Sequence, residues 1–316
     1  MRIIEIASGS AQVRIVPELG CAITAFTVRE TPILRPTPDA ALVERDVRRT
    51  ACYPLIPYSN RIRDARLRFA GHDYVLARNF GASPHAIHGV GWQRPWSVDD
   101  VSAQRARLSL HHDARGDAAA AWPWPFSATQ AFHLTESLRA DGTMSVMLVV
   151  TLTLANIGAE SFPFGLGWHP FFPKDAATRL AFSADFVWRN DATQLPQQRI
   201  PIPDEWRFEP PRALDTITLD NVFTGWHGAA TIDDPAREIT TTLRADSACA
   251  FVVVYAPPGR DFVAVEPVTH ETDAFNRAAA GASATGMRIL APGAAFSCTM
   301  RIAAAASAGP VSSRTP

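Results

Sequence analysis

A regular alternation of apolar and polar residues over Met144–Leu154 constrains the fold more than any other feature of the sequence. The segment reads MSVMLVVTLTL, and its even-numbered residues are all apolar. The residues between them include Ser145, Thr151 and Thr153. A period of two is the spacing of a β-strand with one buried face. An Asn and a Gly follow the segment closely and predict a turn.

Shorter segments with a similar pattern recur along the chain and predict an antiparallel, all-β fold. Proline, at 25 of 316 residues, clusters between them and marks stiff loops. Helical patterns are confined to short stretches around Ala40–Val47 and Glu271–Ala280, too short to cover a parallel sheet. The predicted strands are Ala11–Ile15, Ala22–Val28, Arg105–His111, Ala131–Leu138, Ala229–Ile232, Ile239–Arg244, Phe251–Tyr255, Phe262–Val265 and Phe296–Ile302.

The chain shows no internal repeat and no linker between two compositions, so we predict one domain over residues 1–302. The remaining segment, Ala303–Pro316, reads AAAASAGPVSSRTP. It has little apolar bulk, and we expect a disordered C-terminal tail there.

Charge and cysteine content exclude several classes of function. The formal net charge is -1, which gives no field to gather nucleic acid or an anionic membrane surface. We therefore expect a small neutral molecule or another protein as partner. The four cysteines lie far apart without metal-ligand spacing and are predicted to be buried free thiols. No leader and no membrane-spanning apolar run is apparent, so a cytoplasmic location is expected.

Two segments in the first third of the chain combine polar, aromatic and proline residues as a binding site would. Tyr53–Ile62 reads YPLIPYSNRI and ends in Asn60 and Arg61. An arginine in a loop is commonly a solvated charge, but its fork of donors also suits sugar hydroxyls. The second segment reads NFGASPHAIHGVGWQRPW and contains His88 and Trp92. Tryptophan offers a flat apolar face on which a sugar ring can stack.

Two later segments place a titratable residue directly before a proline. His169 lies in FPFGLGWHPFFP and Glu266 in FVAVEPVTH. Proline pushes the preceding residue towards extended backbone, which holds these side chains on stiff positions. A buried structural histidine and a solvent-exposed carboxylate are the alternatives. Apolar neighbours would raise the pKa of Glu266 and make it a competent proton acceptor.

Together these motifs resemble the aldose 1-epimerase (galactose mutarotase) family over nearly the whole chain. The resemblance begins with MRIIEIASGSAQVRIVPELGCAI and continues through SNRI, HAIHGVGW, GLGWHPFF and VAVEPVT in the order of the family's motifs. It implies a β-supersandwich, a single domain of large twisted antiparallel sheets with a monosaccharide in a cleft. It also implies anomer interconversion without a cofactor or a metal.

The resemblance assigns roles residue by residue. The family's general acid matches His169, its general base Glu266 and its second histidine His88. Its sugar-binding arginine matches Arg61. Its substrate-contacting aspartate matches Asp220, with Asp215 as the alternative, while Asn60, Trp92 and Trp168 are expected neighbours of the sugar. The sequence HGVGWQRPW around His88 lacks the doubled glycine and lysine-rich stretch of galactose enzymes.

Three other functions are compatible with some of these residues. A hexose-6-phosphate mutarotase would need basic residues for the phosphate, such as Arg61, Arg63, Arg66 and Arg94. A non-catalytic sugar sensor would keep the aromatic cleft without needing the acid and base. A cupin-like metal site would use His85, His88 and His169, although no carboxylate accompanies the His-x-x-His pair. The sequence does not decide which sugar is preferred or whether the protein is a monomer or a homodimer.

Overall fold

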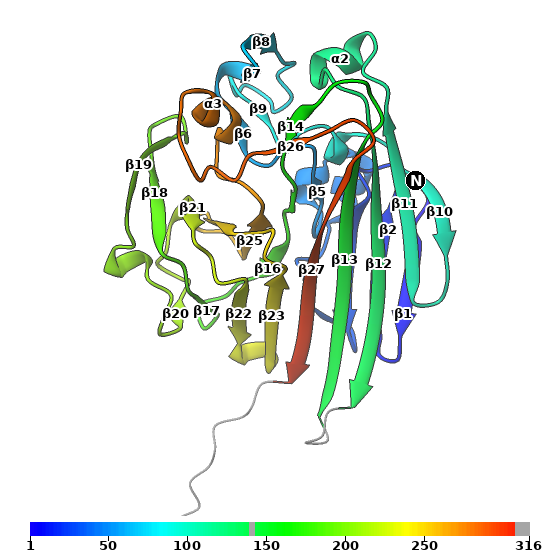
Figure 1. The fold of residues 1–316 in the computed structure, drawn as a ribbon. Helices are drawn as coiled ribbons and strands as arrows, with labels where there is room; N and C mark the ends of the chain where they lie inside the picture. The colour runs from blue at the N-terminus through cyan, green and yellow to red at the C-terminus, as the bar shows by residue number, and fades with distance from the viewer. Residues whose placement is uncertain (139–142, 307–316) are drawn as a thin grey trace, which may run out of the picture.

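The computed structural model describes residues 1–138 and 143–306, and two large antiparallel sheets organise this part of the chain (Figure 1). The first has nine strands in the order β10-β11-β12-β13-β27-β23-β22-β17-β20. Figure 1 shows its long strands β12, β13 and β27 side by side. The strands are β10 (Ser97–Val101), β11 (Arg105–His112), β12 (Phe126–Leu138), β13 (Met144–Asn156), β27 (Ala295–Ala306), β23 (Ile239–Ala245), β22 (Ala229–Asp234), β17 (Arg179–Phe182) and β20 (Arg212–Ala213).

The second sheet has eight strands, of which seven follow the order β19-β18-β21-β24-β25-β15-β5. The eighth, β16 (Phe171–Pro173), pairs with β25. The others are β19 (Pro196–Pro201), β18 (Phe186–Asn190), β21 (Leu219–Thr224), β24 (Phe251–Ala256), β25 (Phe262–Val268), β15 (Gly167–Trp168) and β5 (Pro54–Leu55).

Smaller elements surround the two sheets. A four-stranded sheet contains β1 (Ile4–Ser8), β2 (Ala11–Val16), β3 (Ala22–Val28) and β4 (Thr31–Pro32). Three two-stranded sheets pair β6 (Arg61–Ile62) with β9 (Ala86–Ile87), β7 (Arg66–Phe69) with β8 (His72–Val75), and β14 (Phe162–Phe164) with β26 (Arg288–Leu290). The helices are α1 (Asp39–Val43), α2 (Asp117–Ala121) and α3 (Ala274–Ala279), with 3₁₀ turns η1 (Val47–Arg49), η2 (Arg63–Ala65), η3 (Gly91–Gln93), η4 (Asp204–Trp206) and η5 (Pro235–Arg237).

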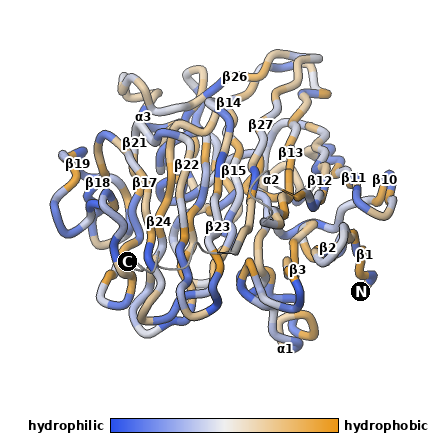
Figure 2. The backbone as a smooth tube through the Cα atoms, turned by 90° about the horizontal axis from the view of Figure 1, so that it is seen from below, coloured by the Kyte–Doolittle hydropathy of each residue, from blue (hydrophilic) through white to orange (hydrophobic). Residues whose placement is uncertain are grey.

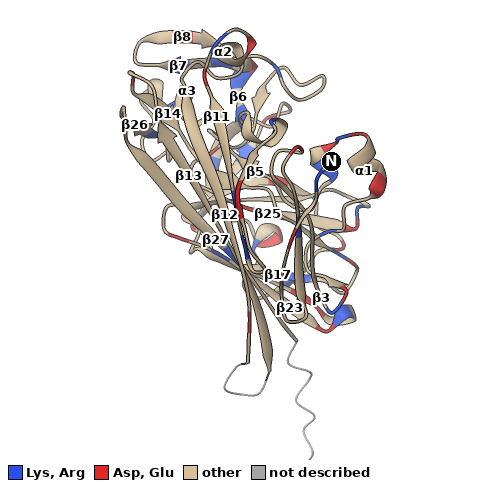
Figure 3. Ribbon diagram, turned by 90° about the vertical axis from the view of Figure 1, so that its right-hand side faces the viewer, with Lys and Arg blue, Asp and Glu red and all other residues tan. Residues whose placement is uncertain are grey.

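The main hydrophobic core takes side chains from both large sheets. Leu148 and Val150 of β13 belong to the same buried cluster as Val254 of β24 and Val265 of β25. Burial of these apolar side chains supplies the main driving force for packing the sheets together. Figure 2 shows apolar segments within the sheets and hydrophilic stretches in peripheral loops such as the one between β18 and β19. Basic and acidic residues are interspersed, and the long strands carry few of either (Figure 3).

The structure confirms the predicted all-β architecture of large antiparallel sheets. Strand β13 covers the predicted segment and extends it to Asn156. The two short predicted helical stretches overlap α1 and contain α3, respectively. None of the helices in the described part of the chain combines the length and the apolarity needed to cross a membrane.

The predicted tail needs a correction at its beginning. Strand β27 runs on to Ala306, and Ala303–Ala305 pair with both β13 and β23. The expected domain boundary at residue 302 therefore lies inside a strand. Residues 307–316 of the predicted tail lie outside the described residues.

Candidate active site

The central strands β21, β24 and β25 of the eight-stranded sheet are buried on both faces, and the alternation of their side chains decides which residues reach the site. In β25, Val263 and Val265 belong to the main core, whereas Ala264 and Val268 belong to a second buried cluster on the other face. Glu266 lies between Ala264 and Val268 at the same two-residue spacing, so its side chain points to their face. Residues Asp220 of β21, Val253 and Tyr255 of β24, and Phe262 of β25 share its face and line one cavity with it.

His169 reaches the same cavity from the residue directly after β15. Its backbone N–H donates to the carbonyl of Tyr53, at 3.0 Å, which fixes the start of the loop. Its imidazole Nε2 lies 3.2 Å from Oε1 of Glu266. Only 7% of His169 and 3% of Glu266 are exposed, so this contact between acid and base is shielded from bulk water.

Burial shifts the pKa values of these two groups in opposite directions. Desolvation raises the pKa of Glu266 well above its usual value, the charge of Asp220 raises it further, and Arg61 opposes the rise. Desolvation lowers the pKa of His169 well below its usual value, and the proximity of His88 and Arg35 adds to the shift. Because the two groups are in contact, they titrate as one coupled unit.

Arg61 and Asp220 form a second polar pair at the cavity wall. Nη2 of Arg61 donates to Oδ2 of Asp220 at 3.3 Å, and Nη1 donates to Oδ1 of Asn60 at 3.0 Å. Both charged side chains remain partly exposed to the cavity. The arrangement offers guanidinium donors and a carboxylate acceptor to the hydroxyl groups of a bound sugar.

Asn60 and His88 hold each other in place through two hydrogen bonds. The backbone N–H of Asn60 donates to Nδ1 of His88 at 3.0 Å, and the backbone N–H of His88 donates to the carbonyl of Asn60 at 2.9 Å. Both residues have left-handed backbones, with φ of 54° and 64°, a strained conformation typical of functional sites. Gly89 follows with φ of 71°, and a Cβ there would lie 2.1 Å from the carbonyl oxygen of Ile56.

This geometry fixes the chemical state of His88. Burial lowers its pKa to about 3, and the charge of Arg61 acts in the same direction, so the imidazole is neutral at neutral pH. Because Nδ1 accepts a hydrogen bond, the remaining proton is on Nε2. His88 therefore acts as a hydrogen-bond donor rather than as a proton carrier. Its ring lies 5.5 Å from that of His169, centroid to centroid.

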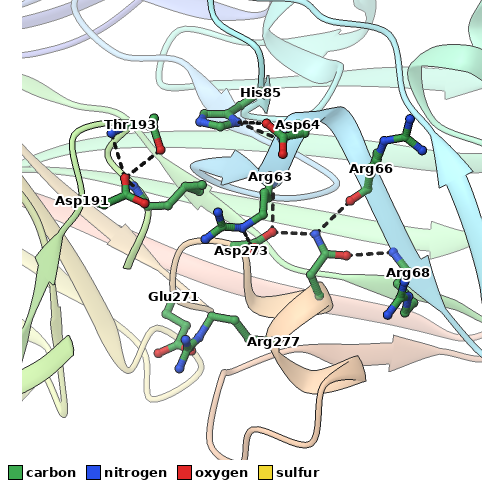
Figure 4. A network of polar contacts seen from close by, with 12 residues as sticks. Arg63, Asp64, Arg66, Arg68, His85, Asp191, Thr193, Glu271, Asp273 and Arg277 are labelled. Carbon is green, nitrogen blue, oxygen red and sulfur yellow. Dashed lines mark hydrogen bonds and ion pairs between the residues drawn. The ribbon is translucent and has the colours of Figure 1, made fainter. Parts of the chain in front are cut away.

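Strand β6, which carries Arg61, is anchored to the segment that follows Glu266. Figure 4 shows one of the contacts, between Asp273 and Arg63 just after β6. The backbone N–H of Asp273 donates to the carbonyl of Arg61, and Oδ1 of Asp273 accepts from the backbone N–H of Arg63. The same oxygen accepts from Nδ2 of Asn276 in α3. These bonds connect the strand that carries Arg61 to the chain segment that follows Glu266.

The residues described above line a cavity of about 540 Å³, within the usual range for small-molecule sites. A larger cavity of about 750 Å³ lies beside it and shares the wall residues Arg48 and Phe80. It contains neither His169 nor Glu266. We therefore identify the smaller cavity as the candidate active site.

Most of the predicted site residues line this cavity, but the two tryptophans do not. His169, Glu266, His88, Arg61, Asn60 and Asp220 all line it. Trp168 points to the opposite face, where it is buried in the main core and its indole N–H donates to Gln130. Trp92 lies behind Tyr53 and lines the neighbouring cavity. Both tryptophans are thus supports of the site and are not expected to contact the sugar.

The structure also distinguishes between the other sequence alternatives. Asp220 pairs with Arg61, whereas Asp215 does not line the cavity. Arg63 and Arg66 line a separate cavity. His85 accepts from the backbone N–H of Asp64, and within residues 1–138 and 143–306 no three His, Cys, Asp or Glu side chains are grouped to hold a metal ion.

Sequence reasoning missed several residues of the cavity. Tyr53 packs against the His169 ring at 4.9 Å, and Phe171 stacks on it at 4.3 Å. Their positions within the quoted motifs YPLIPYSNRI and WHPFF were the available signal. Four arginines outside those motifs also line the cavity, and no sequence signal identified them. They are Arg35, Arg48, Arg49 and Arg260.

Comparison with known proteins gives a consistent assignment. The family model described as aldose 1-epimerase matches residues 2–303. The uncharacterized protein YphB of Escherichia coli K12 is 31% identical over 301 residues, which cover 93% of this chain and 95% of YphB. A crystal structure of a candidate aldose 1-epimerase from Escherichia coli K12 superposes with a TM-score of 0.83 at 28% identity, covering 96% of this chain and 98% of that one. A galactose mutarotase-like protein from Clostridium acetobutylicum superposes with a TM-score of 0.81 at 19% identity, covering 96% and 94% of the two chains. With its fold and nearly its whole length matched, this chain belongs to the aldose 1-epimerase family.

Proposed function

We propose that the protein interconverts the α and β anomers of an aldose by acid–base catalysis. The observation that supports this function best is the buried contact of 3.2 Å between His169 Nε2 and Glu266 Oε1 at the wall of a sugar-sized cavity. An acid and a base side by side can act on the two oxygens that share the anomeric carbon.

The reaction begins from the charged form of the pair. The Glu266 carboxylate takes the proton of the anomeric hydroxyl while the His169 imidazolium gives a proton to the ring oxygen. The bond between the anomeric carbon and the ring oxygen breaks and leaves the open-chain aldehyde. After rotation about the bond between the first two carbons, both protons return and the ring closes as the other anomer. The pair holds one proton before and after turnover.

Both pKa shifts favour ring opening. A carboxylate whose pKa is raised by burial is a stronger base, and an imidazolium whose pKa is lowered is a stronger acid. The same shifts favour the uncharged form of the empty pair. The contact between the two groups offsets part of this preference, because it stabilises the charged form as an ion pair.

The surrounding groups bind and orient the sugar. His88 offers its Nε2–H as a fixed neutral donor, and Arg61 with Asp220 binds hydroxyl groups. Hydrogen-bond donors held in place before the reaction stabilise charge that develops on the sugar oxygens. They also hold the open aldehyde in the cavity until it closes.

The test is to follow the approach to anomeric equilibrium of freshly dissolved α-glucose, α-galactose and L-arabinose by polarimetry or proton NMR. We expect the protein to accelerate the approach for at least one sugar, and the Glu266→Gln variant serves as the matched blank. Sugar binding without acceleration would replace the proposed enzyme with a sugar-binding protein. Equal acceleration of the approach to equilibrium by the protein and by the Glu266→Gln variant would remove Glu266 from the mechanism.

A further inference from the structure

The active-site cavity contains more positive charge than recognition of a neutral sugar requires. Five arginines line it, against the carboxyl groups of Asp220 and Glu266. Three of the five are neutralised by a carboxylate within 3.3 Å: Arg48 by Asp46, Arg49 by Glu44, and Arg61 by Asp220. The remaining two, Arg35 and Arg260, form no ion pair with any carboxylate in the described parts of the chain, residues 1–138 and 143–306.

Arg35 is held in one orientation by its surroundings. Its Nη2 donates to the carbonyls of Arg48 and Thr50, at 2.9 and 2.6 Å. Its Nε is buried without a hydrogen-bond partner among the described residues. Burial lowers its pKa to about 10, so the group keeps its charge at neutral pH. Arg35 is thus a fixed cation that lines the cavity, and its charge is suited to attracting an anion there.

The distance of Arg35 from the reacting atoms fits a substituent of the sugar ring. Its guanidinium carbon lies 3.7 Å from the centre of the Phe171 ring, and the imidazole of His169 stacks on the same ring at 4.3 Å. Two groups this close to one ring occupy opposite faces of it. The Phe171 ring therefore separates the guanidinium of Arg35 from the imidazole of His169. In a pyranose whose ring oxygen faces His169 and whose anomeric hydroxyl faces Glu266, the other exocyclic group next to the ring oxygen is the one on carbon 6.

Arg260 lines the same cavity from the exposed turn between β24 and β25. Burial raises the pKa of Tyr255 and the charge of Asp220 raises it further, whereas the charges of Arg260 and Arg35 both oppose the rise. Tyr255 thus lies within electrostatic reach of both guanidinium groups. Arg35 also stacks on Phe262, at 4.4 Å, two residues after Arg260. The two arginines without an ion pair therefore act on one region of the wall, where the charge of Asp261 offsets part of that of Arg35.

We propose that the substrate of this enzyme is an acidic aldose, whose anionic group on carbon 6 is bound by Arg35 and Arg260. This inference rests on the proposed anomer interconversion and specifies its substrate class. A carboxylate, a phosphate ester and a sulfonate share the chemistry required. Arg61 and Asp220 then bind the hydroxyl groups of the same sugar.

The experiment compares kcat/KM for anomer interconversion of glucose, glucuronate and glucose 6-phosphate. We expect at least one acidic sugar to exceed glucose about tenfold or more, since a hydrogen bond to a charged group contributes enough free energy for such a factor. Rising ionic strength should lower kcat/KM for the acidic sugar more than for glucose, because salt screens the attraction. The two acidic sugars distinguish a carboxylate site from a phosphate site.

Three variants test whether Arg35 and Arg260 bind the anionic group. Arg260→Gln and Arg35→Met should each lower the ratio of kcat/KM between acidic and neutral sugar about tenfold, mainly through KM, and Arg35→Lys should restore part of it. Arg105→Gln, an exposed arginine of the nine-stranded sheet, is the control and should leave the ratio unchanged.

The outcomes separate the two proposals. Acceleration of glucose with equal or lower kcat/KM for both acidic sugars would overturn the inference and leave the proposed function intact. A ratio that is unchanged in both Arg35→Met and Arg260→Gln would also overturn it. No acceleration of any sugar would overturn the proposed function itself.

Discussion

In the central strands of the eight-stranded sheet, both faces are buried but differ in chemistry. On the face towards the nine-stranded sheet, Leu219, Val254 and Val265 join a continuous apolar core. On the other face, the next residues along the same strands are Asp220, Tyr255 and Glu266. Neighbours in the chain thus serve opposite purposes, one set holding the sheets together and the other forming a cavity.

The comparison shows how a buried carboxylate can be tolerated. The cost of placing Glu266 away from water appears as its raised pKa. The apolar face of the same strands supplies the packing that keeps the sheet intact despite this cost. We therefore expect substitutions on the two faces to have different effects, the cavity face acting on catalysis and the core face on stability.

The largest effect is expected for Glu266→Gln. The amide keeps the size of the side chain but cannot accept the proton, so kcat should fall by about 10²- to 10⁴-fold while sugar binding is largely retained. Initial rates of anomer interconversion and a binding titration measure the two quantities. Glu205→Gln, at an exposed glutamate of η4, is the control. A nearly normal kcat in Glu266→Gln would contradict the division between the faces.

Leu219→Ala tests the core face at the residue before Asp220. Leu219 is only 3% exposed, and its truncation should lower the free energy of unfolding by about 2–5 kcal/mol. We expect kcat to be retained in the folded protein. Urea denaturation measures the loss, and Val75→Ala, at a residue that is 68% exposed, should change stability by less than about 0.5 kcal/mol. Lost activity with unchanged stability would show that the faces are not separable.

The buried histidines predict a loss of stability in acid. Burial lowers the pKa of His270 to about 4 and that of His88 to about 3. Between pH 6.5 and these values the unfolded chain binds protons that the folded protein does not, so stability falls as the pH falls. Each histidine should contribute roughly 2 kcal/mol of this loss between pH 6.5 and pH 5. Urea midpoints at several pH values measure it, and constant stability over this range would disprove the neutral state of both rings.

A smaller effect is expected for Asp220→Asn, which keeps the shape of the cavity face but removes one charge. Loss of the charged acceptor should lower kcat/KM about tenfold. Since the reaction needs one proton on the pair, the rate should depend on pH in a bell-shaped curve. Because Asp220 raises the pKa of Glu266, the alkaline limb of this curve should move to lower pH in Asp220→Asn. Asp215→Asn is the matched control and should change neither quantity. An unmoved alkaline limb in Asp220→Asn would separate Asp220 from the titration of the pair.

The fold was predictable where a strand has one polar face. The alternation over Met144–Leu154 is confirmed by β13, and Ala22–Val28 coincides with β3. The pattern fails for Ala303–Ala306, because a run of alanines has no apolar and polar alternation to reveal a face. Its pairing with β13 and β23 depends on the neighbouring strands rather than on its own composition.

The site was predictable from motifs but not in its orientation. In the stretch GLGWHPFF nearly every side chain is aromatic or small, so the sequence did not show that Trp168 and His169 point to opposite faces. The cavity arginines were missed for a different reason. Arg35 and Arg260 lie outside the quoted motifs, and only tertiary packing brings them near Tyr255.

The division of β25 into two faces has a consequence for changes in chain length. Loss or gain of a single residue within Phe262–Val265 would exchange the two faces of the strand after that point. Glu266 would then point towards the hydrocarbon core, and its place opposite His169 would be taken by Pro267 after a loss or by Val265 after a gain. A shift of one residue in β25 would therefore remove the proposed base from the cavity and also bury an unpaired carboxylate, although the rest of the sequence is unchanged. Length variation compatible with activity is therefore confined to loops such as the one between β18 and β19, where no alternation has to be preserved.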